Sequence, residues 1–172
     1  MRPEMKEIFV HPCEVWFGGG HVRLRTILGS CVAITLWHPT LRVGGMCHYM
    51  TSCRHVQRAN QTNGCHAEKA MEMLQAKIRA TGRSPDEFEA KVFGGGHMFP
   101  DKGGPICHLG WVQVANITAG KELLARHGHR VVAEHLGGEG HRQLIFEVPT
   151  GQVWLKHNPP RKTAGHDGRK AA

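Results

Sequence analysis

Large aliphatic residues at 32, 34 and 36 alternate with Ala33, Thr35 and Trp37, which is the period of a β-strand. Residues 38–41, with proline at their centre, interrupt the alternation. An apolar run then resumes over residues 43–50. The two runs predict a β-hairpin whose loop has about four residues, a common connection length.

The hydrophobic period changes to that of a helix over residues 66–81. Five apolar residues fall on one helical face: Ala67, Ala70, Met71, Leu74 and Ile78. Gly82 is a plausible end for this helix. A second, weaker helix is predicted over residues 117–127, where Gly120 lowers the helix propensity.

Further strand patterns follow both helices. We predict a short strand over 91–93, another over 130–134, and a hairpin formed by 143–148 and 152–156. Strands outnumber helices, and the two do not alternate regularly as they do in repeated βαβ units. The pattern therefore predicts an α+β fold of packed layers.

The chain has 172 residues, a length that suits one domain. Residues 158–172 carry no apolar periodicity, and we expect them to form a basic, disordered tail. No apolar run approaches the ~20 residues of a membrane span, and the N-terminus lacks the apolar stretch of a signal peptide. These features predict a soluble, intracellular protein with no membrane insertion.

The cysteines predict little redox or metal chemistry. Six are present: Cys13, Cys31, Cys47, Cys53, Cys65 and Cys107. None forms a CxxC pair, and a chain this long without a signal peptide is expected to keep its thiols reduced. Cys47, His48, Cys53 and His55 form a candidate zinc cluster, but their spacing matches no standard tetrahedral site. We therefore expect no metal and no cofactor.

The net charge is 22 − 14 = +8, which raises the question of nucleic-acid binding. Five of the basic residues lie in the last seventeen positions, so the globular part is less basic than the total suggests. No basic helix or aromatic platform for nucleic acid is apparent. An acidic protein partner or simple solubility accounts for the charge equally well.

Cys31 and His48 are the sharpest candidates for chemistry. If the hairpin loop is residues 38–41, antiparallel pairing places Cys31 directly opposite His48, with Cβ atoms roughly 4.5–5.5 Å apart. An imidazole at that distance can share the thiol proton and convert Cys31 into a strong nucleophile. The alternation turns Cys47 to the other face. The alternative is that Cys31 is a buried core thiol and His48 an ordinary strand residue.

Small residues precede the candidate nucleophile. Gly29 and Ser30 allow backbone N–H groups to come close to a substrate carbonyl, as an oxyanion site requires. Thr26 carries a hydroxyl that could orient the histidine or hold a substrate amide, although a structural role is the more common one for such a threonine. We expect the triple glycine at 94–96 to form a tight turn beside this site.

Four sequence blocks resemble the CheD family of chemoreceptor glutamine deamidases: TILGSCVAITLWHP, VGGMCHYM, KVFGGGHMF and VVAEHLGGEGHRQLIFEVPTGQVWLK. The match covers roughly residues 7–157, so we expect one CheD-like domain over 1–157 and the tail over 158–172. The resemblance implies an α/β sandwich of the type found in cytotoxic necrotizing toxin deamidases, with mixed sheets and two main helices.

The resemblance also implies a cytoplasmic cysteine hydrolase that needs no cofactor. Its nucleophile falls on Cys31, its base on His48 and its supporting hydroxyl on Thr26. The implied substrates are glutamines on the cytoplasmic bundle of methyl-accepting receptors, and in some bacteria a CheC-type phosphatase is a partner. A non-catalytic adaptor on the same fold is the alternative, and methylesterase or transglutaminase side activities would use the same nucleophile.

Several positions depart from the usual family pattern. Cys47 replaces an asparagine, residues 51–53 replace a Leu-Pro strand end, and no tyrosine starts the first helix near residues 63–65. The stretch 108–116 is longer than the family spacing. These departures concern partner docking and substrate fit, because the three catalytic positions are all retained.

Overall fold

The computed structural model describes residues 4–50, 64–98 and 109–160, which form two β-sheets and two α-helices. The four-stranded sheet has the order β1 (Lys6–Phe9), β3 (Val22–Leu28), β8 (His141–Glu147) and β9 (Gln152–Asn158). The five-stranded sheet has the order β2 (Val15–Gly19), β5 (Val43–Tyr49), β4 (Val32–His38), β6 (Glu89–Gly94) and β7 (Arg130–Leu136). The helices are α1 (Ala67–Ala80) and α2 (Leu109–Arg126), and a short 3-10 turn, η1, spans Pro85–Glu87.

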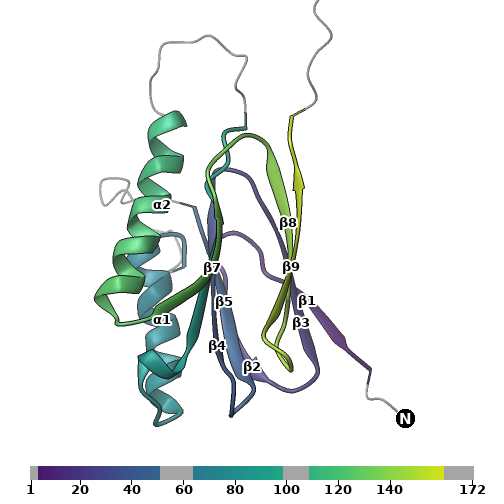
Figure 1. The fold of residues 1–172 in the computed structure, drawn as a ribbon, viewed down its shortest axis with the longest axis vertical. Helices are drawn as coiled ribbons and strands as arrows, with labels where there is room; N and C mark the ends of the chain where they lie inside the picture. The colour runs from purple at the N-terminus through teal and green to yellow at the C-terminus, as the bar shows by residue number, and fades with distance from the viewer. Residues whose placement is uncertain (1–3, 51–63, 99–108, 161–172) are drawn as a thin grey trace, which may run out of the picture.

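The elements stack in three layers: helices, five-stranded sheet, four-stranded sheet (Figure 1). Both sheets are mixed, since β1–β3 and β6–β7 pair in parallel and the other neighbours are antiparallel. The predicted α+β class, with mixed sheets and two main helices, is confirmed. Neither helix in the described ranges is long and apolar enough to span a membrane.

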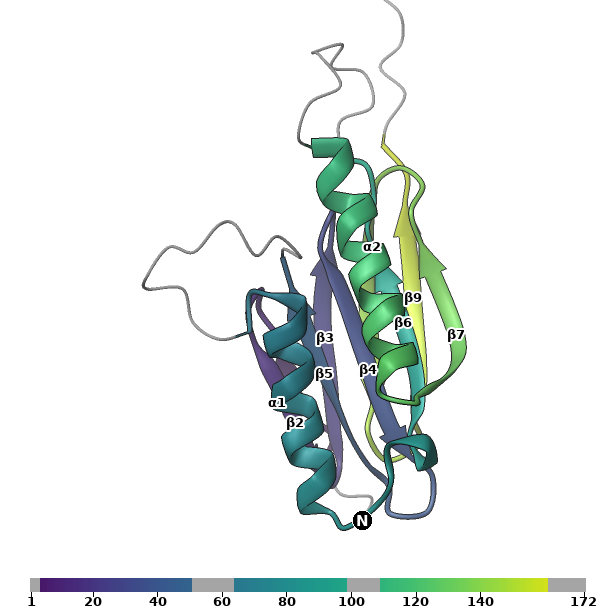
Figure 2. The same cartoon turned by 90° about the vertical axis from the view of Figure 1, so that its left-hand side faces the viewer.

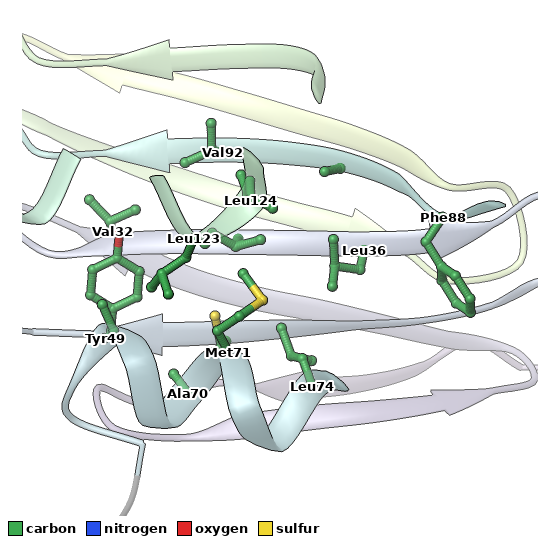
Figure 3. Packing of buried hydrophobic residues seen from close by; sticks show 14 of the residues in the cluster. Val32, Leu36, Tyr49, Ala70, Met71, Leu74, Phe88, Val92, Leu123 and Leu124 are labelled. Carbon is green, nitrogen blue, oxygen red and sulfur yellow. The ribbon is translucent and has the colours of Figure 1, made fainter. Parts of the chain in front are cut away.

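Two hydrophobic cores separate the layers. Helices α1 and α2 lie side by side over the same face of the five-stranded sheet (Figure 2), and their apolar faces form the first core with β4 and β5. Val32, Tyr49, Met71, Leu74 and Leu124 all belong to this core (Figure 3). The second core fills the space between the two sheets. The five-stranded sheet is therefore covered on both faces, which explains why nearly every residue of β4 is buried.

Strand β3 was not among the predicted elements, nor were β1 and β2. Its sequence, VRLRTIL, alternates strictly: Val22, Leu24, Thr26 and Leu28 point inward, while the intervening residues are more exposed. The outward face of the four-stranded sheet has no helix over it (Figure 1), so β3 keeps the one-sided pattern of a half-exposed strand. The period-2 signal was present in the sequence.

The predicted hairpin register is wrong by two residues. His38 pairs with Val43, so the loop is residues 39–42, and His48 faces Ala33 rather than Cys31. The His38 side chain is the physical reason: its Nδ1 accepts the N–H groups of Thr40 and Leu41, both at 3.2 Å, and so caps the turn. A shift of two keeps every side chain on its predicted face.

The helix predicted over 66–81 is confirmed as α1, whereas α2 begins at Leu109, eight residues before the predicted start. Val112 and Val114 stand two residues apart on either side of Gln113, a spacing typical of a strand that hides the helical period in the first two turns. At the other end of the chain, β9 continues to Asn158, one residue into the predicted tail. Residues 161–172 of that tail lie outside the described residues.

The expectation of reduced cysteines is wrong for one pair. Cys13 and Cys65 form a disulfide with a Cα–Cα distance of 3.9 Å, although 52 residues separate them in the chain. The backbone of Gly64 lies against the carbonyl of Cys13, where an added Cβ would meet the carbonyl oxygen. Cys31 and Cys47 are free thiols. Positions 53 and 107 lie outside the described residues.

Candidate active site

The predicted site residues gather where the chain crosses from one sheet to the other. Residues 29–31 connect β3 of the four-stranded sheet to β4 of the five-stranded sheet, and the crossing lies at one end of the sandwich (Figure 1). Thr26 on β3 and His48 on β5 both point into the space between the sheets, and both are buried. Cys31 is partly exposed and packs against the same inter-sheet core. Cys31 and His48 therefore share a face without being direct neighbours in the ladder.

One nitrogen of His48 is held by a hydroxyl and a carbonyl. Thr26 Oγ1 lies 2.8 Å from His48 Nδ1 and donates its own proton to the Val10 carbonyl at 2.7 Å. Because a hydroxyl has a single proton, Thr26 can only accept from Nδ1. The Nδ1 of His48 consequently carries the hydrogen, and Nε2 carries the lone pair.

The free nitrogen, Nε2, is buried and has no hydrogen-bond partner in the described part of the chain. Cys31 Sγ is thus not hydrogen-bonded to it. A buried imidazole nitrogen with an unused lone pair is a proton acceptor of the kind that a general base requires. Catalytic hydrogen bonds often form only when substrate is bound, so this geometry is compatible with a base role.

Burial keeps both members of the pair neutral. It lowers the pKa of His48 to about 4, opposed mainly by the Val10 carbonyl, with His11 lowering it further and Glu14 raising it. Burial also raises the pKa of the Cys31 thiol, against a hydrogen bond from its own backbone amide. At neutral pH the two resting side chains are therefore a thiol and a neutral imidazole, not a thiolate and an imidazolium.

The backbone of His48 is fixed by the loop that precedes β2. Its carbonyl accepts from the Cys13 N–H at 2.7 Å, and its N–H donates to the Glu14 carbonyl at 3.0 Å. Cys13 adopts a positive φ of 74°, which a non-glycine residue adopts only where the surroundings require it. The disulfide to Cys65 ties this loop to the segment that enters α1.

Three consecutive carbonyls at the sheet crossing are all hydrogen-bonded. Gly29 O accepts from the Gly96 N–H at 2.8 Å, and Cys31 O accepts from the Gly95 N–H at 2.8 Å. Ser30 O accepts from the side-chain amide of Asn116 at 3.2 Å. A trans peptide directs its N–H away from its carbonyl, so these bonds also fix the directions of the Ser30 and Cys31 N–H groups. Neither of these N–H groups donates to a backbone carbonyl in the described part of the chain.

The triple glycine is the tight turn beside the site that the sequence predicted. Gly94 and Gly95 have φ values of 118° and 64°, in the region that favours glycine. A Cβ on Gly94 would collide with the carbonyl oxygen of Cys31. Only glycine allows this turn to approach residues 29–31 closely enough for the two backbone hydrogen bonds.

Sequence reasoning did not identify Val10 or Asn116. The Val10 carbonyl leaves no sequence signal, because any residue supplies one. Asn116 did leave a signal: an asparagine in a helix interior is unfavourable unless its side chain has a partner. The placement of α2 eight residues too late concealed that position.

The alternative of a zinc cluster, which the spacing did not favour, has no support in the described residues. Cys47 is buried among the helices on the face of β5 opposite His48, and burial raises its pKa to about 12. Its thiol and the His48 imidazole therefore point away from each other. No group of three metal-binding side chains is close enough to hold an ion in the part of the chain that the structure describes. Cys53 and His55 lie outside that part.

A family model described as CheD chemotactic sensory transduction matches residues 51–157. A protein of Pseudomonas savastanoi pv. phaseolicola is 44% identical over 89% of this chain and 85% of its own length. This chain belongs to the CheD family. The family-model match begins after Cys31 and His48, so it is the relatives, aligned over nearly the whole chain, that extend the similarity across the site.

The Pseudomonas relative is named a probable chemoreceptor glutamine deamidase CheD. A Dechloromonas aromatica relative with a corresponding name is 41% identical over 88% of each chain. A Leptospira interrogans relative is 32% identical over 87% of this chain and 92% of its own. Among solved structures, the crystal structure of Bacillus licheniformis hypothetical protein YfiH is similar with a TM-score of 0.46 and 13% identity, covering 70% of this chain and 49% of that one.

Proposed function

We propose that this protein is a chemoreceptor glutamine deamidase, a protein-glutamine glutaminase with Cys31 as nucleophile. It hydrolyses glutamine side chains on the cytoplasmic bundle of methyl-accepting chemotaxis receptors to glutamate and ammonia. The observation that carries the proposal is the His48 imidazole, which Thr26 holds with a buried, unpartnered Nε2 on the same side of the sheet as Cys31. Membership of the CheD family supports the substrate class.

In the first half-reaction, His48 Nε2 takes the thiol proton as Cys31 Sγ bonds to the carboxamide carbon of the glutamine. The π electrons of that carbonyl move to its oxygen. The N–H groups of Ser30 and Cys31, fixed through their peptide carbonyls, are the oxyanion donors in this proposal. Protonated His48 then gives its proton to the amide nitrogen, and the C–N bond breaks as the carbonyl re-forms. Ammonia departs, and the substrate carbonyl remains bound to Cys31 as a thioester.

In the second half-reaction, water replaces ammonia. His48 Nε2 takes a proton from the water as its oxygen bonds to the thioester carbon. The C–S bond breaks, the Cys31 sulfur recovers the proton from His48, and a glutamate side chain is released. A neutral resting histidine suits both steps, because each begins with proton acceptance.

The test is mass spectrometry of receptor cytoplasmic fragments incubated with the wild-type protein, with Cys31→Ala and with Cys47→Ala. We expect glutamine-to-glutamate conversion with the wild type and Cys47→Ala, and none with Cys31→Ala. Cys47 is the matched control, since it is a free thiol on the opposite face of the same sheet. Conversion by a folded Cys31→Ala protein would refute the nucleophile.

Thr26→Val probes the support of the base. It removes the acceptor for the Nδ1 hydrogen and leaves the shape of the side chain nearly unchanged, so we expect kcat to fall roughly 10- to 100-fold. Thr35→Val is the control, because Thr35 is an equally buried threonine on β4. Equal kcat values for the two variants would show that Thr26 does not support His48.

The proposal places the protein in the cytoplasm, where the receptor bundle is accessible, with a CheC-type phosphatase as a second partner. Co-purification of the two proteins at physiological salt would support that partner. If receptor fragments bind the protein but no glutamine on them is converted, the non-catalytic adaptor becomes the better description.

A further inference from the structure

Asn116 lies on α2 and reaches out of its helix to two other segments. Its Nδ2 donates to the carbonyl of Ser30 at 3.2 Å and to the carbonyl of Met50 at 3.0 Å. The residue is fully buried. Both hydrogens of the amide are therefore used on backbone groups that precede Cys31 and follow His48.

The two carbonyls stand just past the end of a strand ladder. Pairing of β4 with β5 stops at Val32 and Tyr49. Ser30 and Met50 lie beyond that last pair, where no ladder bond fixes them. Asn116 supplies the bond between the two chain segments in place of the sheet.

The remaining atom of the amide argues against a purely stabilising role. Asn116 Oδ1 is buried and has no hydrogen-bond partner in the described residues. An unpaired buried acceptor lowers stability. The unpaired oxygen thus offsets part of the stability that the two donated hydrogen bonds contribute, while those donors hold backbone at the candidate site.

The bond to Ser30 has a direct consequence for the oxyanion site. The Ser30 carbonyl and the Cys31 N–H belong to one trans peptide plane, so fixing the carbonyl fixes the direction of the N–H. Backbone N–H groups of the glycine turn hold the carbonyls of Gly29 and Cys31 on either side. Asn116 is the side chain that fixes the peptide between them, the one that joins Ser30 to Cys31.

We propose that Asn116 is a positioning residue of the deamidation reaction: it holds the Ser30–Cys31 peptide so that the Cys31 N–H points at the developing oxyanion. This inference rests on the proposed function. An oxyanion exists only in the transition state and the intermediate, so loss of the clamp lowers kcat and leaves substrate binding nearly unchanged.

The experiment compares Asn116→Ala with Tyr49→Phe. Tyr49 Oη donates to the backbone carbonyl of Asn116 at 2.6 Å, so Tyr49→Phe loosens the same turn of α2 and keeps the amide clamp. For each variant we would measure kcat and KM on a receptor fragment, the urea midpoint, and the rate of Cys31 alkylation by iodoacetamide, mapped by peptide mass spectrometry.

For Asn116→Ala we expect kcat to fall on the order of 10- to 100-fold and KM to change less than about threefold. In the reaction with iodoacetamide, the Cys31 sulfur attacks a methylene carbon and displaces iodide, so no oxyanion forms. The alkylation rate of Asn116→Ala should therefore stay within about twofold of the wild-type rate. Tyr49→Phe should lower the urea midpoint and keep kcat.

Equal kcat values for the two variants, or a parallel loss of kcat and alkylation in Asn116→Ala, would overturn the positioning role. If Asn116→Ala does not fold, Asn116→Ser, which keeps one donor, replaces it under the same criteria. A wild-type protein that converts no receptor glutamine overturns the proposed function as well, so the two failures are distinguishable.

Discussion

The Thr26 hydroxyl decides which nitrogen of His48 is available. It has one proton and donates it to Val10, so it orients the imidazole with Nδ1 protonated and Nε2 free. Burial then prevents the imidazole from holding a second proton at neutral pH. Thr26, the Val10 carbonyl and burial thus leave His48 neutral with a free Nε2, which is the form that the proposed base role requires.

The lowered pKa of His48 predicts an unusual acid limb of the activity profile. The proposed base must be unprotonated to accept the thiol proton, so kcat/KM, which reports the free enzyme, should show no loss from His48 protonation as the pH falls through 6.5 and should drop only as it approaches about 4. The measurement is kcat/KM for receptor deamidation between about pH 4 and about pH 8. An acid limb centred near the ordinary histidine pKa would contradict a neutral buried base.

The same shift couples pH to stability. The unfolded chain protonates His48 below 6.5 and the folded chain only below about 4, so stability is lost as the pH falls between those values, by about 3 kcal/mol in all. His48→Gln should lack this part of the loss. Comparison of urea unfolding for the two proteins at several pH values isolates it from the other histidines.

At the scale of elements, close contacts between strands, helices and turns outweigh local propensity. Gly120 weakens α2 by propensity, yet a Cβ there would lie 2.5 Å from Tyr49 Oη. The glycine therefore lets α2 pack directly on the last residue of β5. The hairpin register is likewise set by a specific contact, because the capping of the turn by His38 fixes which residues of β4 and β5 face each other.

Gly120→Ala should consequently destabilise the protein, although alanine is the better helix former. The propensity gain of up to ~1 kcal/mol is smaller than the overpacking cost, so we expect a net loss of about 1–2 kcal/mol in the free energy of unfolding. Urea denaturation would measure it. In a Tyr49→Phe background the hydroxyl is absent, and the same substitution should cost less or stabilise; a cost equal in both backgrounds would rule out this contact as the cause.

At the scale of the whole molecule, the net charge affects how the protein associates with its substrate rather than the chemical step. The chain carries a formal +8, and a net positive surface attracts an acidic partner over about a Debye length. The site lies at one end of the sandwich (Figure 1), and its reacting groups are neutral at rest. Long-range attraction thus acts on substrate capture and leaves the chemical step alone.

If receptor bundles are the acidic partner, raising the salt concentration from about 50 mM to about 300 mM should increase KM several-fold and leave kcat within about twofold. Steady-state kinetics on one receptor fragment would measure both. A KM that does not respond to salt would exclude electrostatic steering.

By itself the sequence determined the class of the fold and the family, and it named Cys31 and His48 as the candidates for chemistry. Strong hydrophobic periods marked α1, β4, β5 and the C-terminal hairpin, because each buries a continuous apolar face. The alternation along β5 also separated His48 from Cys47, since that property depends on period and not on register. The four sequence blocks pointed to the CheD family, to which the comparisons assign the chain.

Tertiary structure alone decided how those residues are arranged. The register of the hairpin depends on a side-chain cap, the tautomer of His48 depends on a carbonyl of residue 10, and the peptide before Cys31 depends on an asparagine from α2. Burial, which sets both pKa shifts, arises only when the two sheets close over the site. Contacts between distant segments carry no local period, so a pattern read along the chain cannot contain them.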